Sequence, residues 1–277
     1  MIAFPPAKIN LGLNVLRKRA DGFHDIESVL VPIPLHDVLE IILAPDVAAG
    51  EVVFTSSGLP VPGDTANNLC LKAVRAVRAH RPLPGLRMHL HKVIPMGAGL
   101  GGGSSDGAHT IRLLDQFLDL QLGDALKHEL AASLGSDCPF FLSDRPQLAT
   151  GRGEVLEPVD LDLRGWWLAL VNPGIHVGTP EVYQNTAPTG HSMDFASTLR
   201  NAAPAAWRSH VVNTMETYVF SAYPAVQAVR DELLDMGADH AAMSGSGSSV
   251  FGLFREKPVL PELFRTAPYC SWVLKFT

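Results

Sequence analysis

A run of small residues between Pro95 and Ala108 is the part of the sequence whose composition points most directly to chemistry. Six of the eleven residues from Gly97 to Gly107 are glycine. Glycine weakens helices and strands and fills no volume, so a packed core gives no reason for such a run. Backbone N–H groups without bulky side chains beside them can approach an anion closely. The run therefore predicts a phosphate-binding loop.

The segments on either side of this loop suit that role. Alternating apolar residues over 86–94 predict a strand that leads into the loop, and apolar residues at helical spacing over 108–118 predict a helix that leaves it. A helix N-terminus carries partial positive charge and unpaired N–H groups, which together attract phosphate. Strand, glycine loop and helix thus predict a nucleotide-binding site.

Two common nucleotide-binding motifs fit the run poorly. Gly97, Gly99 and Gly102 match the dinucleotide pattern G-x-G-x-x-G, but Asp119 and Asp124 precede another predicted helix, so no second strand ends in an acidic residue. The P-loop is excluded because no Gly-Lys-Ser/Thr ends the run. An ordinary structural turn remains the alternative to an anion site.

Two serines follow the glycines where the next helix is expected to begin. The hydroxyls of Ser104 and Ser105 are well placed to cap that helix. They are equally suited to bind phosphate oxygens or Mg²⁺, and the two roles are compatible.

The bulk composition indicates a folded protein with a large core. The chain has 277 residues, 47% of them apolar and 18% charged, which suits one large domain or two ordinary ones. The net charge of −6 has the wrong sign for a general nucleic-acid binder. We therefore expect a small anionic ligand and no nucleic acid.

The cysteines and apolar segments indicate the compartment. Cys70, Cys138 and Cys270 are far apart and odd in number, which argues against a disulfide framework or a zinc site and favours a reducing cytoplasm. The N-terminus lacks the pattern of a secretory signal. The longest clean apolar stretch, 166–171, is too short to span a membrane, so no membrane association is expected.

Periodicity elsewhere predicts intermixed strands and helices. In the first half, strands are expected at 9–16, 26–35, 39–43, 52–55 and 138–142, and helices from Asp64 or Thr65 to about His80 and from Asp124 to Gly135. In the second half, strands are expected at 166–171, 250–254 and 272–276, and helices from Thr179, at about 208–220 and at about 224–236. This mixture predicts an α+β fold with two lobes, residues 1–150 and 151–277, divided within the Pro- and Gly-rich segment 144–165.

A second run of small residues lies at 243–249. Such a run either closes on a substrate or simply connects a helix to the strand that follows it. The sequence leaves both interpretations open.

Several segments together resemble the GHMP kinases. They are Pro6-Ala7-Lys8-Ile9-Asn10-Leu11-Gly12-Leu13, Arg19-Ala20-Asp21-Gly22-Phe23-His24, Pro95 to Ser105, Gly135-Ser136-Asp137-Cys138-Pro139-Phe140, Asn172-Pro173-Gly174 and Met243-Ser244-Gly245-Ser246-Gly247. The resemblance covers essentially the whole chain. The glycine loop is typical of the whole family, whereas the Ala-Lys-Ile-Asn and Asp-Gly-Phe-His pair is similar to one member, whose acceptor alcohol carries a cytidine diphosphate group.

The resemblance implies a fold and an activity. The fold would have a ribosomal protein S5 domain 2-like N-terminal lobe and a ferredoxin-like C-terminal lobe. The activity would be ATP-dependent phosphorylation of a small alcohol in isoprenoid precursor biosynthesis, by a cytoplasmic monomer or homodimer. Catalysis would come from positioning and charge compensation, without a covalent enzyme intermediate.

The resemblance also implies two catalytic residues. Asp137 would accept the proton of the acceptor hydroxyl, and Lys8 would stabilise charge on the acceptor oxygen and orient Asp137. A positive neighbour lowers the pKa of a carboxyl group and keeps it ionised. Taken alone, Asp137 is an ordinary turn residue and Lys8 a solvated lysine before a strand.

The donor side implied by the resemblance binds ATP and Mg²⁺. Its candidate residues are Pro95, Met96, Gly97, Ala98, Gly99, Leu100, Gly101, Gly102, Gly103, Ser104 and Ser105, with Asn68 and Lys92 near the adenine and phosphates. Ser104 is the candidate Mg²⁺ ligand. Asn68 and Lys92 are equally compatible with surface positions on their own elements.

The acceptor side would be lined by Asn10, Phe23, His24 and Tyr183. The ring of Phe23 or Tyr183 can stack on a pyrimidine, and His24 can form hydrogen bonds with its edge. By composition alone, Phe23 and His24 also suit a hairpin turn in which one residue packs on the core.

The chain departs from the family pattern at two places. Asn or Asp followed by Ala is expected after the two serines, whereas Asp106 is followed by Gly107, which costs about 1 kcal/mol of helix propensity relative to Ala. Asp106 would then complement the helix dipole or hold Mg²⁺ through water. Cys138 replaces a small or β-branched residue after Asp137, and its size is compatible with the same geometry.

Three other functions remain alternatives. The first is a GHMP kinase for another alcohol, of the homoserine or mevalonate type. The second is a nicotinamide-dependent oxidoreductase, which needs a parallel βαβ unit around residues 86–125. The third is a module that binds ATP without catalysis.

Overall fold

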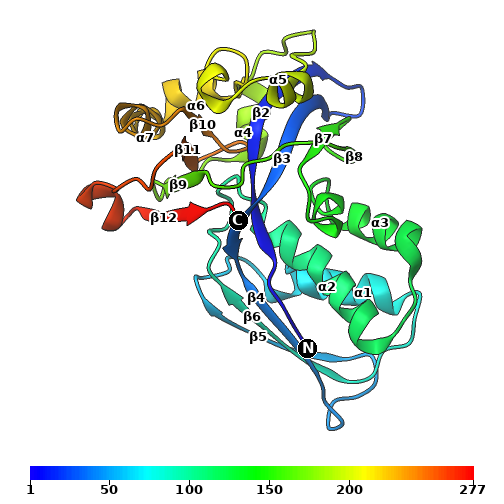
Figure 1. Ribbon diagram of the computed structural model, residues 1–277. Coiled ribbons are helices and arrows are strands. Elements are labelled where there is room, and N and C mark those ends of the chain that lie inside the picture. Colours follow the sequence, from blue (N-terminus) through cyan, green and yellow to red (C-terminus); the bar gives the residue numbers. More distant parts are fainter. The chain divides into compact units, whose positions relative to one another are not determined.

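The computed structural model describes residues 1–277, and the chain forms two compact units (Figure 1). Unit 1 comprises residues 1–7, 35–96 and 101–144, and unit 2 comprises residues 8–34, 97–100 and 145–277. Both units are assembled from separate stretches of chain, whereas the predicted lobes are two continuous halves. The boundary near residue 150 stays a prediction.

Unit 1 is built on a four-stranded sheet. Its strands, in spatial order, are β1 (Ile2–Ala3), β4 (Val38–Leu43), β6 (Leu86–Lys92) and β5 (Val52–Gly58). β4 pairs antiparallel with β6, and β5 pairs parallel with it. β6 alternates buried and more exposed side chains, with Leu86, Met88 and Leu90 buried. The strand therefore has one core face, as its period of two predicts.

Helices α1 (Leu69–Arg78) and α2 (Gly102–Leu118) lie side by side along the unit 1 sheet, and α2 contacts β4 and β1 (Figure 1). Helix α3 (Gly123–Leu134) packs against α1 and α2. A Cβ added to Gly107 would lie 3.1 Å from Leu69 Cβ and 3.3 Å from Leu134 Cδ1. Gly107 thus lets α1 and the end of α3 pack closely on α2, which gives a structural reason for this departure from the family pattern.

Two predictions in unit 1 are wrong in detail. The helix expected from Asp64 or Thr65 begins at Leu69, because Asp64 caps a short 3₁₀ turn (Thr65–Asn67) and the Asn68 side chain accepts the Cys70 N–H to cap α1. The strand expected at 138–142 is a 3₁₀ helix, Pro139–Leu142. A short apolar run does not distinguish strand from helix, and Pro139 at the first position favours the helix.

Unit 2 contains two further four-stranded sheets. One has the order β10 (His240–Met243), β11 (Val250–Phe254), β9 (Trp167–Asn172) and β12 (Cys270–Lys275), all antiparallel. The other has the order β2 (Pro6–Lys18), β3 (His24–His36), β7 (Gln147–Thr150) and β8 (Val155–Pro158), with the first two residues of β2 and the last two of β3 counted in unit 1. Two long strands thus carry the N-terminal motifs.

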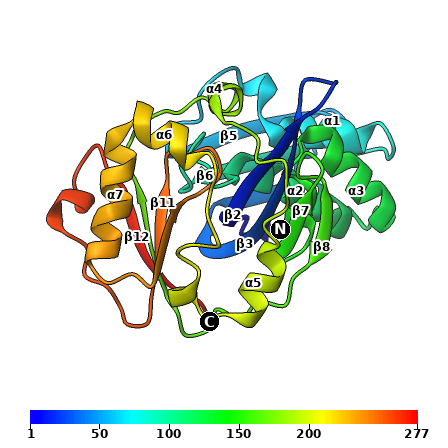
Figure 2. The ribbon, with the colours of Figure 1, turned by 90° about the horizontal axis from the view of Figure 1, so that it is seen from above.

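Helices α6 (Glu216–Ala222) and α7 (Pro224–Asp235) lie on one face of the β10-β11-β9-β12 sheet (Figure 2). The remaining helices of unit 2 are α4 (Thr179–Asn185), α5 (Phe195–Asn201) and the 3₁₀ helices Pro204–Ala206 and Glu262–Arg265. The helix expected at about 208–220 begins only at Glu216. Asn213 explains the delay, since its Oδ1 accepts the Met215 N–H and holds a turn before the helix.

The connectivity excludes a dinucleotide-binding unit at the glycine loop. The loop follows β6, and the chain then runs through α2 and α3 into the 3₁₀ helix, with no parallel strand between them. The parallel pair of unit 1, β5 and β6, encloses α1 and precedes the loop. No helix of the chain is long and apolar enough to cross a bilayer.

Candidate nucleotide and acceptor site

The glycine run forms the loop between β6 and α2, called here the phosphate loop (residues 95–105). Its alternate glycines, Gly97, Gly99 and Gly101, have left-handed φ angles of +63°, +78° and +69°. Gly101 is the N-cap of α2 and offers no side chain to the first turn. The first N–H groups of a helix lack partners inside it, so this helix start can bind an anion.

Gly99 is required by a close approach inside unit 2. A Cβ at this position would lie 1.9 Å from the carbonyl oxygen of Ser244. The Ser244 hydroxyl donates to the Gly99 carbonyl at 2.9 Å, and the Ser249 N–H donates to the Ala98 carbonyl at 3.2 Å. The middle of the phosphate loop therefore rests on residues 243–249, called here the second loop. The sequence alone explained this glycine by anion access and missed the packing.

Lys8 lies beside the same glycine. Its ammonium donates to Asn10 Oδ1 at 2.6 Å and to the Gly99 carbonyl at 3.1 Å, and the residue is 3% exposed. Asn10 Nδ2 in turn donates to Ser28 Oγ at 2.8 Å, so the amide orientation is fixed from β3. The interpretation of Lys8 as a solvated lysine is thereby excluded. Two predicted residues, Lys8 and Asn10, meet at the phosphate loop.

Aromatic side chains of unit 2 gather where the β2–β3 hairpin turns. The His24 ring stacks on Tyr183, with centroids 5.1 Å apart and planes 24° from parallel. Phe23 is 52% exposed, and the Arg152 guanidinium lies 4.8 Å from its ring centroid. Partial burial, aided by Lys18, lowers the pKa of His24. A neutral imidazole has one donor and one acceptor, which suits the edge of a base.

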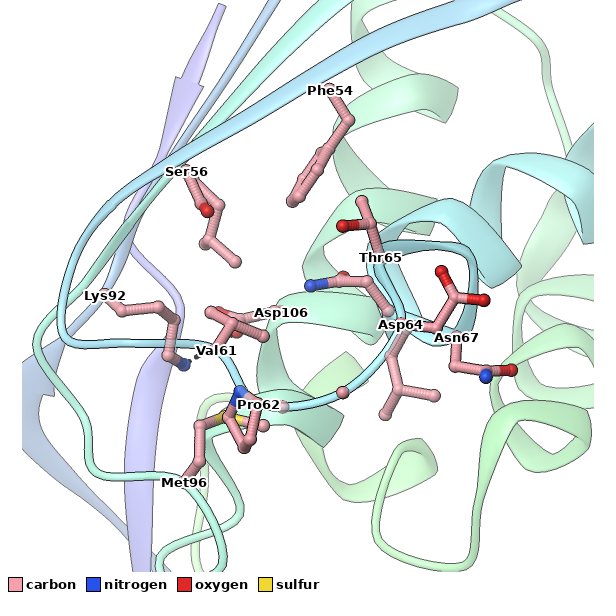
Figure 3. A pocket seen from close by; sticks show the side chains of 15 residues that line it. Phe54, Ser56, Val61, Pro62, Asp64, Thr65, Asn67, Lys92, Met96 and Asp106 are labelled. Carbon is pink, nitrogen blue, oxygen red and sulfur yellow. Dashed lines mark hydrogen bonds and ion pairs between the residues drawn. The ribbon is translucent and has the colours of Figure 1, made fainter.

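A pocket of about 150 Å³ opens in unit 1 beside β5, β6 and α2 (Figure 3). It is lined by predicted donor-side residues together with others not anticipated: Phe54, Ser56, Val61, Pro62, Gly63, Asp64, Thr65, Asn67, Asn68, Leu69, Leu90, Lys92, Met96, Gly103 and Asp106. Asn68, Lys92, Met96 and Gly103 were all expected near a nucleotide. Their convergence on one pocket supports the assignment of this side to the donor.

Lys92 forms hydrogen bonds with the side chains of two acidic residues at the wall of this pocket. Its ammonium donates to Asp37 Oδ2 and, at 2.8 Å, to Asp106 Oδ2. Burial raises the pKa of Asp106 to about 8, with Lys92 opposing and Asp37 adding to the rise. The other oxygen, Asp106 Oδ1, is buried without a hydrogen-bond partner. The structure adds a buried contact with Lys92 that the sequence did not predict for Asp106, and its suggested roles toward the helix dipole or Mg²⁺ stay predictions.

Asp137 follows α3 in the turn that begins at Gly135. Its neighbour Cys138 is buried, and its thiol lies near Ser104 of the phosphate loop, whose hydroxyl acts to lower the pKa of the thiol. Burial raises the pKa of the Cys138 thiol to about 12, so it stays protonated. The Asp137 segment is thus attached to the start of α2 within unit 1. The predicted pairing of Asp137 with Lys8 stays a prediction.

The sequence did not single out three residues of these surroundings. Asp37 lies between β3 and β4 in an otherwise largely apolar stretch of sequence, and this position was the only sequence feature that could have pointed to a buried, functional carboxyl group. Ser244 belongs to a run whose role was left open. His176 lies against the phosphate loop, with its Cε1 and Nδ1 each 3.6 Å from where a Cβ on Gly97 would be. No local pattern distinguished this exposed histidine.

The chain offers no preformed metal centre of its own. No group of three or more His, Cys, Asp or Glu side chains could hold a metal ion. Mg²⁺ in kinases is held largely by phosphate oxygens and water, with few protein ligands. A single hydroxyl such as that of Ser104, at the first turn of α2, is compatible with that chemistry.

Comparison with known proteins defines the class to which this fold and site belong. The family model described as "GHMP kinases N terminal domain" matches residues 68–145, and that described as "GHMP kinases C terminal" matches residues 195–267. Mevalonate kinase from Methanococcus jannaschii, 14% identical, superimposes with a TM-score of 0.72 over all of this chain and 98% of its own, which shows the shared fold.

More similar relatives lie within one branch of that class. The 4-diphosphocytidyl-2-C-methyl-D-erythritol kinases of Cytophaga hutchinsonii and Parabacteroides distasonis are 46% and 45% identical, over 93% of this chain and 94% and 93% of theirs. A crystal structure of 4-(cytidine 5'-diphospho)-2C-methyl-D-erythritol kinase, 31% identical, has a TM-score of 0.79 over the full length of both chains. The chain belongs to the GHMP kinases, in the family of these erythritol kinases. The predicted α+β fold and kinase class are confirmed.

Proposed function

We propose that this protein transfers the γ-phosphate of ATP to the 2-hydroxyl of 4-diphosphocytidyl-2-C-methyl-D-erythritol, a step of non-mevalonate isoprenoid precursor biosynthesis. Kinases of this family use ATP and act on small molecules. The observation that carries the proposal is the buried Lys8 ammonium, held by Asn10 and by the Gly99 carbonyl of the phosphate loop. A fixed cation beside a phosphate loop is what phosphoryl transfer to an alcohol requires.

Asp137 and Lys8 are the proposed catalytic residues. Asp137 accepts the proton of the 2-hydroxyl while the 2-oxygen of the acceptor forms a bond to the γ-phosphorus of ATP. The bond between that phosphorus and the β–γ bridging oxygen breaks, which releases ADP. Lys8 offsets the negative charge that develops on the acceptor oxygen. Its hydrogen bond to Asn10, itself held by Ser28, fixes the ammonium before the substrate arrives, so little reorganisation is needed.

The donor side is proposed to combine the phosphate loop with the unit 1 pocket. The phosphates would bind the backbone N–H groups at the start of α2, and the nucleoside would occupy the pocket beside Asn68 and Lys92. Mg²⁺ would arrive with ATP and take Ser104 as a ligand. It would neutralise phosphate charge, as in other phosphoryl-transfer enzymes.

The acceptor side is proposed to recognise the cytidine diphosphate group. Phe23 and the stacked pair His24 and Tyr183 present aromatic faces for a pyrimidine, and Arg152 beside Phe23 presents a cation for a phosphate. Asn10 would orient the erythritol end near Lys8. We further expect a cytoplasmic monomer or homodimer that binds no nucleic acid.

The test is a kinase assay on the purified protein with ATP, Mg²⁺ and the cytidylated alcohol. ³¹P NMR should show ADP and a new phosphomonoester on the 2-oxygen. Asp137→Asn should lower kcat on the order of 10²-fold to 10⁴-fold and leave ATP affinity near normal. A near-normal rate in that variant removes Asp137 from the role of base.

The choice of acceptor is tested with a panel of alcohols. Homoserine and mevalonate should be poor substrates, because they lack the pyrimidine and diphosphate that the acceptor side would bind. Turnover of either at an efficiency comparable to the cytidylated alcohol would overturn the substrate assignment. ATP binding without transfer to any acceptor would instead leave a nucleotide-binding module.

A further inference from the structure

The side chains of Asp37, Lys92 and Asp106 meet in the interior of unit 1 next to the pocket, and Figure 3 shows two of them, Lys92 and Asp106, in the pocket lining. Lys92 and Asp37 have fully buried side chains, and that of Asp106 is 4% exposed. Burying charges is costly, and replacing a buried ionic group with apolar residues is often neutral or stabilising. Stability alone therefore gives a weak reason for this cluster, called here the Lys92 clamp.

The members of the Lys92 clamp come from three different segments. Asp37 lies between β3 and β4, and its Oδ1 accepts the N–H groups of Val93 at 2.6 Å and Ile94 at 2.9 Å. Lys92 is the last residue of β6. Asp106 lies near the start of α2. The clamp therefore holds the chain just before the phosphate loop and just after it.

The start of α2 lies directly over the Lys92 ammonium. A Cβ added to Gly102, the first residue of the helix, would be 3.2 Å from Lys92 Nζ and 2.8 Å from Ile94 Cγ2. The N–H groups that face a phosphate belong to this same first turn. A displacement of the Lys92 ammonium would thus move the N–H groups that bind the anion.

We propose that Asp37 and Asp106 are positioning residues of the nucleotide site, which act through Lys92 to fix the start of α2 against the end of β6. The inference rests on the proposed function, since it assumes that ATP binds at the phosphate loop. Lys92 then acts from within the pocket wall, with its ammonium engaged by carboxylates, and not as a direct phosphate ligand.

The first test compares Asp106→Ala with Asp106→Asn by steady-state kinetics. Asp106→Ala should raise KM for ATP roughly tenfold or more, with a smaller change in kcat and in KM for the acceptor, because the phosphate-binding N–H groups lose their fixed position. Asp106→Asn keeps an oxygen that accepts from Lys92 and should recover most of the loss. Asp124→Ala, which removes a fully exposed carboxylate of unit 1, is the matched control.

The second test measures hydrogen exchange in the phosphate loop in the absence of ATP. Hydrogen exchange of the peptide spanning residues 95–105 should become faster in Asp106→Ala than in wild type, while the peptide of α3 keeps its protection. If the loop exchanged faster in Asp106→Ala but the wild-type protein bound no ATP, the Lys92 clamp would stand and the proposed function would be rejected. If Asp106→Ala changed neither KM for ATP nor exchange in the phosphate loop, the proposal would be overturned, even if the variant had a lower melting temperature.

An uncharged clamp separates positioning from folding. The triple variant D37N/K92M/D106N carries no buried charge, so it should fold even where Asp106→Ala does not. It should still show a raised KM for ATP, because the thioether that replaces the ammonium has no N–H to bridge the two side chains by hydrogen bonds. Wild-type kinetics in this folded variant would likewise overturn the proposal.

Discussion

Two loops of the molecule are alike in composition and differ in what they do. The phosphate loop and the second loop are both rich in glycine and serine. The phosphate loop leads from a strand into the N-terminus of α2. The second loop leads from β10 into the antiparallel strand β11, and so corrects the expectation that it joins a helix to a strand.

The second loop forms many of its hydrogen bonds within itself and with other residues of unit 2. The Ser244 N–H donates to the Ser249 carbonyl at 2.9 Å, and Asn213 Nδ2 donates to the carbonyls of Met243 at 2.9 Å and Gly245 at 2.8 Å. Ser244, Ser248 and Ser249 are fully buried. A loop of this kind supports its neighbour and has few groups to offer a ligand.

The contrast shows that the next element decides the role of a small-residue loop. A helix start leaves N–H groups without partners, whereas a strand uses its N–H groups in the ladder. Gly99 joins the two cases, since it belongs to the phosphate loop and yet is required by packing on the second loop. The predictions below test this division between a binding loop and a supporting loop.

The largest effect is expected for Gly99→Ala. The left-handed backbone and the overlap with the Ser244 carbonyl should together cost roughly 2–5 kcal/mol, and the displaced loop should lose most ATP turnover. Gly97→Ala is the matched control, because its φ is also positive but its nearest neighbour is 3.6 Å away. Denaturant unfolding and KM for ATP would measure both. Equal effects at the two positions would contradict the packing argument.

Asn213→Ala should come next. It leaves the carbonyls of Met243 and Gly245 buried without donors, at a cost of about 2–4 kcal/mol. Asn201→Ala removes an exposed amide that bonds within α5 and should cost much less. The melting temperatures of the two variants provide the measurement. A drop no greater than that of the control would mean that the second loop is not held by Asn213.

Glu216→Gln should change how stability depends on pH. Glu216 Oε1 accepts the Met243 N–H at 2.7 Å, and burial raises its pKa from 4.5 to about 7, with Arg230 opposing and Asp231 adding to the rise. A raised folded-state pKa gives stability that is complete below pH 4.5 and is lost as the pH rises through 7.

Glu216→Gln keeps an oxygen that accepts the Met243 N–H but has no carboxyl group to ionise. From acid to alkaline pH, wild type should therefore lose roughly 3 kcal/mol relative to Glu216→Gln, because the pKa shift from 4.5 to about 7 costs about 1.4 kcal/mol per unit. Urea unfolding of both proteins at several pH values gives the difference. Parallel stability curves would show that Glu216 does not titrate in this range.

The smallest effect is expected for Ser244→Ala. It removes the hydroxyl bond to the Gly99 carbonyl and should cost about 1 kcal/mol, with a modest rise in KM for ATP. Ser246→Ala removes a hydroxyl that bonds Thr179 at the start of α4 and should leave KM for ATP unchanged. If Ser246→Ala raised that KM more than Ser244→Ala, the second loop would be acting as more than a support.

Much of the local structure was predictable because its signals are local. The strand, glycine loop and helix around residues 86–118 follow from periodicity, and the motifs around Lys8 and Asp137 identified the family. The errors occur where side chains override periodicity. Asn68 and Asn213 delay helices by capping and turn bonds, and Pro139 turns an apolar run into a 3₁₀ helix.

The sequence by itself determined the kinase class, the phosphate loop and the candidates Lys8, Asn10 and Asp137, because motif spacing and composition are properties of neighbouring residues. Only the tertiary structure decided that Gly99 packs on the second loop and that Lys92 is engaged by Asp37 from 55 residues away. Those facts depend on contacts between distant segments. Such contacts form because buried polar groups must find partners wherever the fold brings them.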